Sequence, residues 1–440
     1  MATKIEIISK ELIKPSSPNP HDSTVHKLSF LDQLNFPTYI SLICFYQNDE
    51  SSRPCIDHGK RSQLLKQSLS ETLATYYPLA GRIKGNFLVD CNDSGALFIE
   101  AQVHCRLTQK AIPIEELNRY LPLDPYNQNL LVGPNAISND VLLAIQLNSF
   151  ECGGTAIGVC ISHKIADAMS LVTFMNTWAA KNRGNNADEE IVRPSFDLGS
   201  HLFPPLDEEP SFPPITQSPE KEKFVTKRFV FDKEKLAALK DEASSAFPRS
   251  HAVENPTRVE AVSAFIWKHY MGISKTKSTL AAVHTVNLRP RMKLPTESFA
   301  FGNLAIIATA VLMSKEEDQE YHKLVCHLQN AIEKINDDYV KIIQSGLPYL
   351  LKSIKEIELI FNPETSYCFF TSWCRFPIYE VNCGWGKPIS VCTPALPGDM
   401  VILMNTRCGE GIEAWISMWK NEMALLPDKL LSLDTGDICF

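Results

Sequence analysis

The sequence predicts an α/β protein of two domains, and three observations support this prediction. The chain has 440 residues, which is more than one ordinary core accommodates. Strand-like and helix-like periods occur in both halves of the chain. A polar, proline-rich stretch of low periodicity, residues 191–222, separates the halves. We therefore expect an N-terminal domain over 1–190 and a C-terminal domain over 223–440, joined by this linker.

The first half predicts strands interrupted by helices. Leucines recur at helical spacing from Leu64 to Leu73, and Pro78 and Gly81 end the predicted helix. Residues 91–95 have the composition of a tight turn, which predicts a hairpin between the strands on either side. The strands expected in this half are 40–46, 87–90, 96–103 and 141–150.

The second half repeats this mixture. Thr257-Arg-Val-Glu260 has the pattern of a capping box, which predicts that a helix begins there. The charge pattern of residues 316–343 predicts one long helix. The expected strands are 225–231, 279–288, 304–313, 368–373, 389–392, 401–404 and 413–416, with further helices at 233–245 and 420–426.

Composition and charge argue against several classes of protein. The net charge of −8, without a dense Lys/Arg stripe, argues against a nucleic-acid partner. No apolar run is long enough to span a membrane, and the N-terminus lacks the apolar core of a signal peptide. The thirteen cysteines are scattered, without zinc-site spacing, which fits reduced thiols. We therefore expect a cytoplasmic protein with no metal and no membrane association.

His163 lies where the sequence period changes. Residues 157–163 alternate as in a buried strand, whereas apolar residues from Ala168 onward recur at helical spacing. An imidazole with a pKa near ~6.5 is the usual general base at neutral pH, and Asp167 follows four residues later. The alternative is a packed histidine, with Asp167 as the N-cap of the helix. From this spacing alone, the packed histidine is the favoured interpretation.

The segment Asn382-Cys-Gly-Trp-Gly386 is the second notable pattern. Gly384 and Gly386 on either side of Trp385 predict a tight bend with a bulky ring wedged against it. A structural turn is favoured over a catalytic role. Cys383 has no histidine near it in the sequence, so we reject it as a nucleophile.

Together the two patterns resemble the HxxxD and DFGWG signatures of the plant BAHD acyltransferase family. Segments 150–158 and 194–204 look most similar to the members of this family that acetylate alkaloids. Further matches to the family follow in order along the chain: Lys14–Pro18, Leu31–Gln33, Tyr77–Arg82, Val286–Arg289, Gly302-Asn303 and Thr371–Trp373.

The resemblance implies a fold and a mechanism. The fold would have two chloramphenicol-acetyltransferase-like domains with mixed sheets, an active-site channel between them, and part of the segment after 386 packed on the N-terminal domain. Acyl-CoA and the acceptor would enter from opposite faces. His163 would deprotonate the acceptor hydroxyl, which attacks the thioester directly. Asp167 would orient the site by pairing with Arg289, with Arg291 as the second choice.

The chain departs from the family at Asn382 and Cys383, where the signature has Asp and Phe. Loss of that carboxylate removes a possible ion pair with an arginine. A broken buried pair costs about 3–5 kcal/mol if the partner charge stays buried. By resemblance, the loop 382–386 lies away from the acceptor and supports the CoA side structurally.

Four residues are candidates for contact with acyl-CoA. Thr257 heads a helix whose backbone N–H groups could hold a CoA phosphate, although ordinary capping is the favoured alternative. Thr371, Ser372 and Trp373 lie where family members place groups near the thioester, so they could stabilise an oxyanion. A simple buried strand is the competing interpretation.

The sequence thus predicts a monomeric acyl-CoA-dependent O-acyltransferase without a bound cofactor. Acetyl-CoA is the expected donor, and a hydroxyl of an alkaloid or similar small molecule is the expected acceptor. Two alternatives remain open. One is an enzyme of the same fold that uses another acyl donor, N-acylation or non-acyl chemistry; the other is a non-catalytic binding protein.

Overall fold

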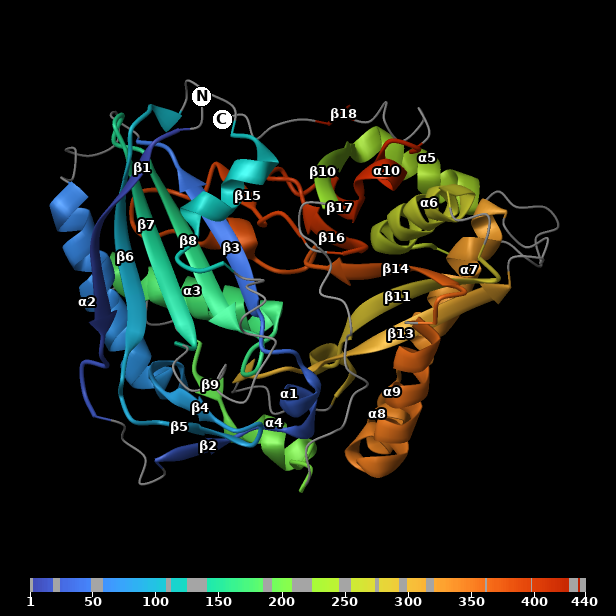
Figure 1. Cartoon of the computed structure of the whole chain (residues 1–440), viewed down its shortest axis with the longest axis horizontal. Coiled ribbons are helices and arrows are strands. Elements are labelled where there is room, and N and C mark those ends of the chain that lie inside the picture. Colours follow the sequence, from blue (N-terminus) through green and yellow to red (C-terminus); the bar gives the residue numbers. More distant parts are fainter. Residues whose placement is uncertain are drawn as a thin grey trace.

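The computed structural model of the protein contains two large mixed sheets that lie side by side along its longest axis (Figure 1). The described residues are 3–18, 24–48, 58–107, 112–124, 141–184, 192–207, 224–244, 255–273, 277–292, 299–313, 320–360, 362–396, 398–426 and 434–435.

The first sheet has six strands in the order β1-β6-β7-β8-β3-β15. Strands β6 and β7 are parallel, and the other neighbours are antiparallel. Its last strand comes from the segment after residue 386, so the C-terminal half of the chain supplies an edge strand to this sheet. The strands are β1 (Ile5–Ile13), β3 (Tyr39–Tyr46), β6 (Ala96–Val103), β7 (Leu143–Phe150), β8 (Thr155–Ser162) and β15 (Ser390–Cys392).

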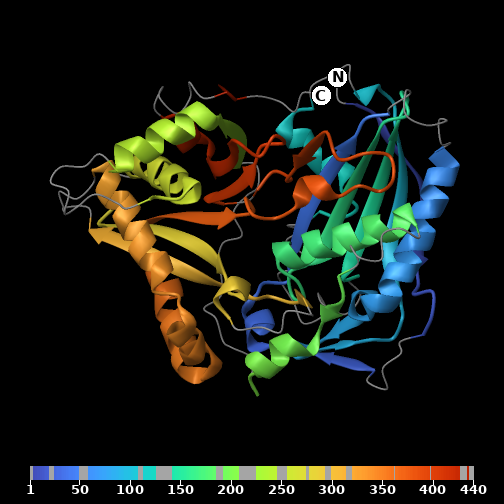
Figure 2. The ribbon, with the colours of Figure 1, turned by 180° about the vertical axis from the view of Figure 1, so that it is seen from behind.

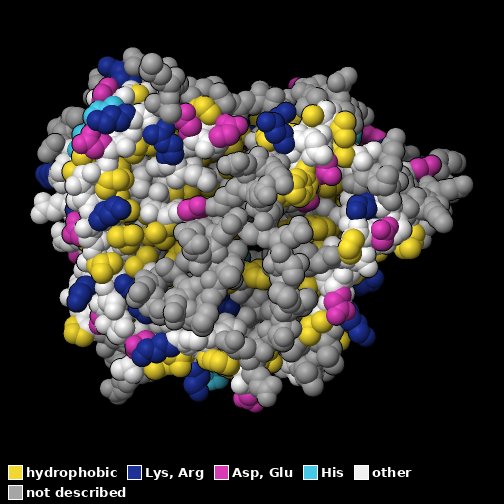
Figure 3. Space-filling model, in the orientation of Figure 1, with side chains coloured by type: hydrophobic (Ala, Val, Ile, Leu, Met, Phe, Trp, Pro, Cys, Tyr) yellow, Lys and Arg dark blue, Asp and Glu magenta, His cyan; other side chains and the backbone are white. Residues whose placement is uncertain are grey.

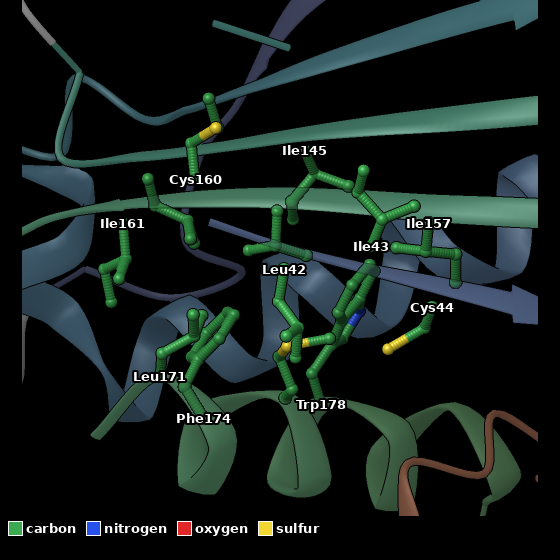
Figure 4. Packing of buried hydrophobic residues seen from close by; sticks show 14 of the residues in the cluster. Leu42, Ile43, Cys44, Ile145, Ile157, Cys160, Ile161, Leu171, Phe174 and Trp178 are labelled. Carbon is green, nitrogen blue, oxygen red and sulfur yellow. The ribbon is translucent and has the colours of Figure 1, made fainter. Parts of the chain in front are cut away.

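Helix α3 (Ala168–Arg183) packs on one face of this sheet, and α2 (His58–Thr75) lies beside it. Figure 4 shows Phe174 and Trp178 of α3 pointing toward the strand residues. The indole N–H of Trp178 donates to the carbonyl of Leu65 at 3.2 Å, so the polar atom of this buried ring is satisfied. All eight residues of β8 are buried, which explains its nearly continuous apolar sequence.

The second sheet has seven strands in the order β13-β11-β14-β16-β17-β10-β18. Helices α5 (Lys233–Ser244), α6 (Arg258–Ile273) and α7 (Tyr321–Glu333) bury their apolar faces against one side of it. The strands are β10 (Phe224–Phe231), β11 (Thr279–Asn287), β13 (Ala305–Met313), β14 (Thr365–Ser372), β16 (Met400–Asn405), β17 (Ile412–Trp419) and β18 (Asp434–Thr435).

The opposite side of the second sheet joins the core of the first. Ile402, Met404 and Trp415 are buried in the same cluster as the residues of β3, β7 and β8. Figure 2 shows the segment after β14 returning to the first sheet beside α3. On the face in Figure 3, the described basic and acidic side chains intermingle, without a patch of one sign.

Short elements complete the structure around the two sheets. None of the helices in the described ranges combines the length and apolar character that a membrane crossing requires. The short strands are β2 (Val25–Lys27), β4 (Arg82–Lys84), β5 (Leu88–Asp90), β9 (Pro194–Ser195) and β12 (Phe299–Ala300), and the remaining α-helices are α1 (Phe30–Leu34), α4 (Asp197–Leu202), α8 (Asp337–Gln344), α9 (Leu347–Ile360) and α10 (Lys420–Met423).

Most strands and helices lie within a few residues of their predicted bounds, but the predicted hairpin at 91–95 is wrong. Strand β5 pairs with β2 and β4 in a separate small sheet, whereas β6 pairs with β1 and β7. At the end of this connection, the N–H of Gly95 donates to the carbonyl of Ala80 at 2.9 Å. Sequence pattern identifies a turn but not which strand lies beside which.

Two other expectations need correction. The predicted helix 316–343 is interrupted, because Asn336 caps a new helix by accepting from the N–H of Tyr339 at 3.0 Å. Its first residues, 316–319, lie outside the described residues. Helix α9 was not predicted. Within the described part of the expected linker, β9 pairs with β12 and α4 follows directly.

Candidate active site

The strand β8 carries the chain to His163. This strand lies between β7 and β3 and ends at Ser162. The backbone N–H of His163 then donates to the carbonyl of Thr38 at 2.8 Å. Thr38 directly precedes β3, so this hydrogen bond extends the pairing of β8 with β3 by one residue. The residue as a whole is partly exposed. A reactive side chain at the end of a rigid central strand is held in place while it remains reachable.

Asn303 determines which nitrogen of His163 carries the proton. Its side-chain oxygen lies 3.0 Å from the Nδ1 atom of His163. Because an amide oxygen only accepts, Nδ1–H donates and the lone pair is on Nε2. Sequence reasoning identified Gly302-Asn303 only as a family match and assigned Asn303 no role. The residues lie 140 positions apart, so spacing gave no signal that they meet.

The electrostatic surroundings keep His163 neutral at pH 7. Burial lowers its pKa below the ordinary value of 6.5, and the charge of Lys164 acts in the same direction. Asp167 and Asn303 act to raise the pKa but do not outweigh burial. A neutral imidazole with a free Nε2 lone pair can accept a proton from a hydroxyl.

Asp167 does not direct its carboxylate to the imidazole. It caps α3, where one oxygen accepts from the N–H of Ser170 at 2.9 Å, and the other accepts from the N–H of Leu304 at 3.1 Å. Arg289 donates to both oxygens, at 2.7 and 3.3 Å. Burial acts to raise the pKa of Asp167, but the charge and hydrogen bonds of Arg289 hold it below the usual value.

Arg289 is held in a fixed position from several sides. Its guanidinium also donates to the carbonyls of Ala300 and Gly302, at 2.9 and 3.1 Å, and stacks over the ring of Phe299. Arg291, the second choice for the partner of Asp167, instead donates to the carbonyl of Asn287 at 3.2 Å. The ion pair therefore ties the start of α3 to the end of β11, and the other hydrogen bonds of Arg289 tie both to the loop before β13.

The loop 382–386 is stabilised by Asn382 itself. The side-chain oxygen of Asn382 accepts from the N–H groups of Gly384 and Gly386, at 2.9 and 3.2 Å. Both glycines have positive φ values, +102° and +105°, which other residues rarely adopt. The Arg183 guanidinium donates to the backbone carbonyl of Asn382. The neutral amide thus fulfils a backbone-capping role without a carboxylate.

This loop lies at the far end of α3 from Asp167. Besides Arg183, the side chain of Asn182 contacts it, donating to the carbonyl of Cys383 at 2.6 Å. Sixteen residues of helix correspond to about 24 Å at 1.5 Å per residue. Trp385 packs edge-on against Tyr46, with ring centroids 6.3 Å apart, so the loop braces the first sheet. Burial raises the pKa of Cys383 to about 12, so its thiol stays protonated and is a poor nucleophile.

The predicted acyl-CoA contacts lie on the second sheet and its helices. Thr257 forms the predicted capping box, because its N–H donates to Glu260 at 2.9 Å and its hydroxyl accepts from the N–H of Glu260 at 3.2 Å. Thr371 and Ser372 end β14 and are partly exposed, whereas Trp373 is buried in the shared core.

Asn405, at the end of β16, links the start of α6 to the segment that follows β14. Arg258 donates to the side chain of Asn405 at 3.3 Å, and Asn405 donates to the carbonyl of Cys374. Burial raises the pKa of the Cys374 thiol, whereas the nearby charges of Arg258 and Arg375 act to lower it. Three of the predicted contact groups, Thr257, Ser372 and Trp373, therefore adjoin a region of positive charge.

A separate hollow of about 560 Å³ opens beside the turn that follows β16. One wall is the Arg228–Glu413 ion pair, with an N–O distance of 3.0 Å. The sheet register runs from Thr371 through the buried Ile402 and Trp415 to Arg228. Packed side chains thus separate this hollow from Thr371. Within the described ranges, no group of three or more His, Cys, Asp or Glu side chains could hold a metal ion.

Comparison with known proteins gives one consistent family. The model of the Transferase family matches residues 3–430. Stemmadenine O-acetyltransferase of Catharanthus roseus is 46% identical, covering 98% of each chain, and vinorine synthase of Rauvolfia serpentina is 43% identical, covering 99% of each. The crystal structure of vinorine synthase superposes with a TM-score of 0.85 at 42% identity over 99% of both chains.

The chain therefore belongs to the Transferase family, and the BAHD family indicated by its motifs is confirmed. The expected α/β fold with two mixed-sheet domains is confirmed as well. The protein is an acyltransferase, and acyl-CoA is the co-substrate in this family. The boundaries of the domains and the roles of the site residues stay predictions.

Proposed function

We propose that this protein transfers the acetyl group of acetyl-CoA to a hydroxyl of an alkaloid or a similar apolar metabolite. The names of its relatives support this reaction: stemmadenine O-acetyltransferase at 46% identity and salutaridinol 7-O-acetyltransferase of Papaver somniferum at 34%. The observation that carries the proposal is the position of His163, a neutral imidazole whose Nδ1 is engaged by Asn303.

In the proposed mechanism, His163 acts as a general base. Its Nε2 takes the proton of the acceptor hydroxyl as the oxygen attacks the thioester carbonyl carbon. The tetrahedral intermediate collapses with cleavage of the C–S bond, and the imidazolium returns its proton to the departing CoA thiolate. Transfer is direct, without an acyl-enzyme. A positioned base of this kind contributes about 10²–10⁴ in rate.

The donor would lie at the ends of β14 and β16, beside the start of α6. In this proposal Thr371 and Ser372, at the end of β14 and next to Trp373, would interact with the thioester, and the start of α6 at Thr257 would bind a phosphate. Positive charge supports this assignment. Burial lowers the pKa of Arg291, and the charge of Arg375 acts in the same direction. With Arg258 they would attract the phosphates of CoA.

The test is an assay of the purified protein with acetyl-CoA and a panel of hydroxylated alkaloids. We expect release of free CoA that depends on the acceptor, and mass spectrometry should show an acetyl ester on the acceptor oxygen. Thermal shift with acetyl-CoA, longer acyl-CoAs and free CoA ranks the donors, because a bound donor raises the apparent stability. An N-acylated product, or preference for a longer acyl group, would contradict the proposal.

We also propose that the enzyme is a monomer in the cytoplasm. The cysteines within the described ranges carry free thiols, which is typical of a reducing compartment. Size-exclusion chromatography with light scattering should give the mass of one chain, 49.4 kDa. A fluorescent fusion should be diffuse in the cytosol. A mass of two chains, or a signal confined to an organelle, would contradict these two statements.

A further inference from the structure

The helix α1 carries a buried carboxylate that faces the loop behind His163. Asp32 is only 4% exposed. One of its oxygens accepts from the N–H and the hydroxyl of Ser29, at 2.8 and 2.6 Å, which completes a capping box. The other oxygen accepts from the backbone N–H and the side-chain amide of Asn303, at 2.9 and 2.8 Å. Both oxygens are thus fully used, one within α1 and one across to the second half of the chain.

These contacts select one orientation of the Asn303 amide. Its NH2 group donates to Asp32 and to the backbone carbonyl of His163, the latter at 2.7 Å, so its oxygen must face Nδ1 of His163. The opposite orientation would place the amide oxygen against a carboxylate oxygen and a carbonyl, and the NH2 group against Nδ1–H. Each of these contacts is repulsive. The carboxylate oxygen of Asp32 and the backbone carbonyl of His163 therefore fix the orientation of the Asn303 side-chain amide.

We propose that Asp32 is a positioning residue for acyl transfer. Through Asn303 it holds the His163 imidazole in the tautomer with the proton on Nδ1, which leaves the Nε2 lone pair toward the substrate. Without the Asp32 carboxylate, the Asn303 amide can turn and donate to Nδ1. The proton then moves to Nε2, and the base is lost. This inference rests on the proposed role of His163 as the base.

Asp167, the acid of the motif, does not serve this purpose. Its two oxygens accept from Arg289, Ser170 and Leu304. Asp167 therefore holds the same loop at Leu304, the residue after Asn303, and it does not contact the imidazole. The loop before β13 is thus held by two buried carboxylates with separate tasks. Asp32 orients the amide of Asn303, and Asp167 fixes the backbone beside it.

The test measures acetyl transfer by Asp32→Ala and by the double variant Asp32→Ala/Asn303→Asp. We expect Asp32→Ala to lower kcat about 10- to 100-fold, within the range that a positioned base contributes, with the KM for acetyl-CoA unchanged. The double variant should recover part of the loss, because a carboxylate at 303 presents an oxygen to Nδ1 in either orientation, while its second oxygen faces the carbonyl of His163 and limits the recovery. The loss of activity at low pH should also begin at a higher pH in the double variant, since a carboxylate raises the pKa of the imidazole.

The controls separate positioning from folding. Asp232→Ala removes an acid that accepts from the N–H of Lys235 at the start of α5, far from the site, and should leave kcat unchanged. If Asp32→Ala does not fold, Asp32→Leu has a similar size but offers no acceptor to Asn303, and it should change kcat in the same direction. Unchanged kcat in a folded Asp32 variant, or no recovery in a folded double variant, overturns the proposal. Full activity of His163→Ala would instead overturn the proposed role of His163 as the general base, on which this inference rests.

Discussion

The guanidinium of Arg289 donates two hydrogen bonds to the carboxylate of Asp167, at 2.7 and 3.3 Å, and both side chains are about 10% exposed. The pair connects the first turn of α3 with the end of β11, which belong to different halves of the chain. Because both oxygens of Asp167 are occupied, the acid of the motif stabilises the loop behind His163 and is not the partner of a catalytic triad.

We predict that Asp167→Asn destabilises the protein by about 3 kcal/mol, the lower end of the cost of breaking a buried ion pair. An amide can still cap α3, but it leaves the charge of Arg289 buried without an anion. Urea unfolding measures the change. Glu380→Gln is the matched control, because it removes the exposed pair with Lys387 and should cost less than about 1 kcal/mol. Equal losses in the two variants would contradict this role.

We predict that Asn382→Asp, which restores the residue of the family signature, is tolerated and raises stability by up to about 1 kcal/mol. A carboxylate accepts more strongly than an amide from the N–H groups of Gly384 and Gly386, and it adds attraction to Arg183. Thermal unfolding should show the gain, while kcat stays unchanged because the loop lies far from His163. A large change in kcat would show that the loop acts on the reaction.

We predict that His284 makes the protein sensitive to acid. It is buried on β11 and stacked on Phe370, with ring centroids 4.7 Å apart, and burial lowers its pKa to about 3. The unfolded chain binds this proton near pH 6.5, so stability falls as pH drops below 6.5 and continues to fall toward 3. The loss from this group at pH 5 is about 2 kcal/mol, at about 1.4 kcal/mol per pKa unit.

The measurement is the change in unfolding free energy between pH 7 and pH 5 for His284→Gln. This change should be smaller than in the parent by about the same 2 kcal/mol. His201→Gln removes an exposed histidine of α4 and should behave as the parent does. An identical pH dependence in all three proteins would show that His284 is not buried in its neutral form.

The sequence predicted the local part of the site well. The change of period at His163 and the cap at Asp167 depend only on residues close together in the sequence. In the structure, β8 ends at Ser162 and α3 begins at Ala168. The capping box at Thr257 is local for the same reason. Such features depend on backbone geometry over a few residues, which sequence pattern records directly.

The contacts between distant segments were not predictable from pattern. Asp32, Asn303 and His163 meet because α1, the loop before β13 and the end of β8 converge in the folded chain. Both Asp32 and Asn303 occur in segments that resemble the family, but no spacing links them to the imidazole. The pairing of Asp167 with Arg289 was expected only from the resemblance, and the wrong hairpin at 91–95 has the same origin, since strand partners are chosen by tertiary packing.

The central claim is that His163 is the general base, and the pH dependence of kcat/KM for acetyl transfer by the parent and by His163→Ala tests it most directly. Because burial holds the pKa of His163 below 6.5, the parent should keep its activity down to pH 6.5 and lose it at lower pH. The alanine variant, if folded, should have a kcat/KM lower by about 10²–10⁴-fold, and it should not show this loss of activity below pH 6.5. An alanine variant as active as the parent, with the same loss of activity at low pH, would contradict the account.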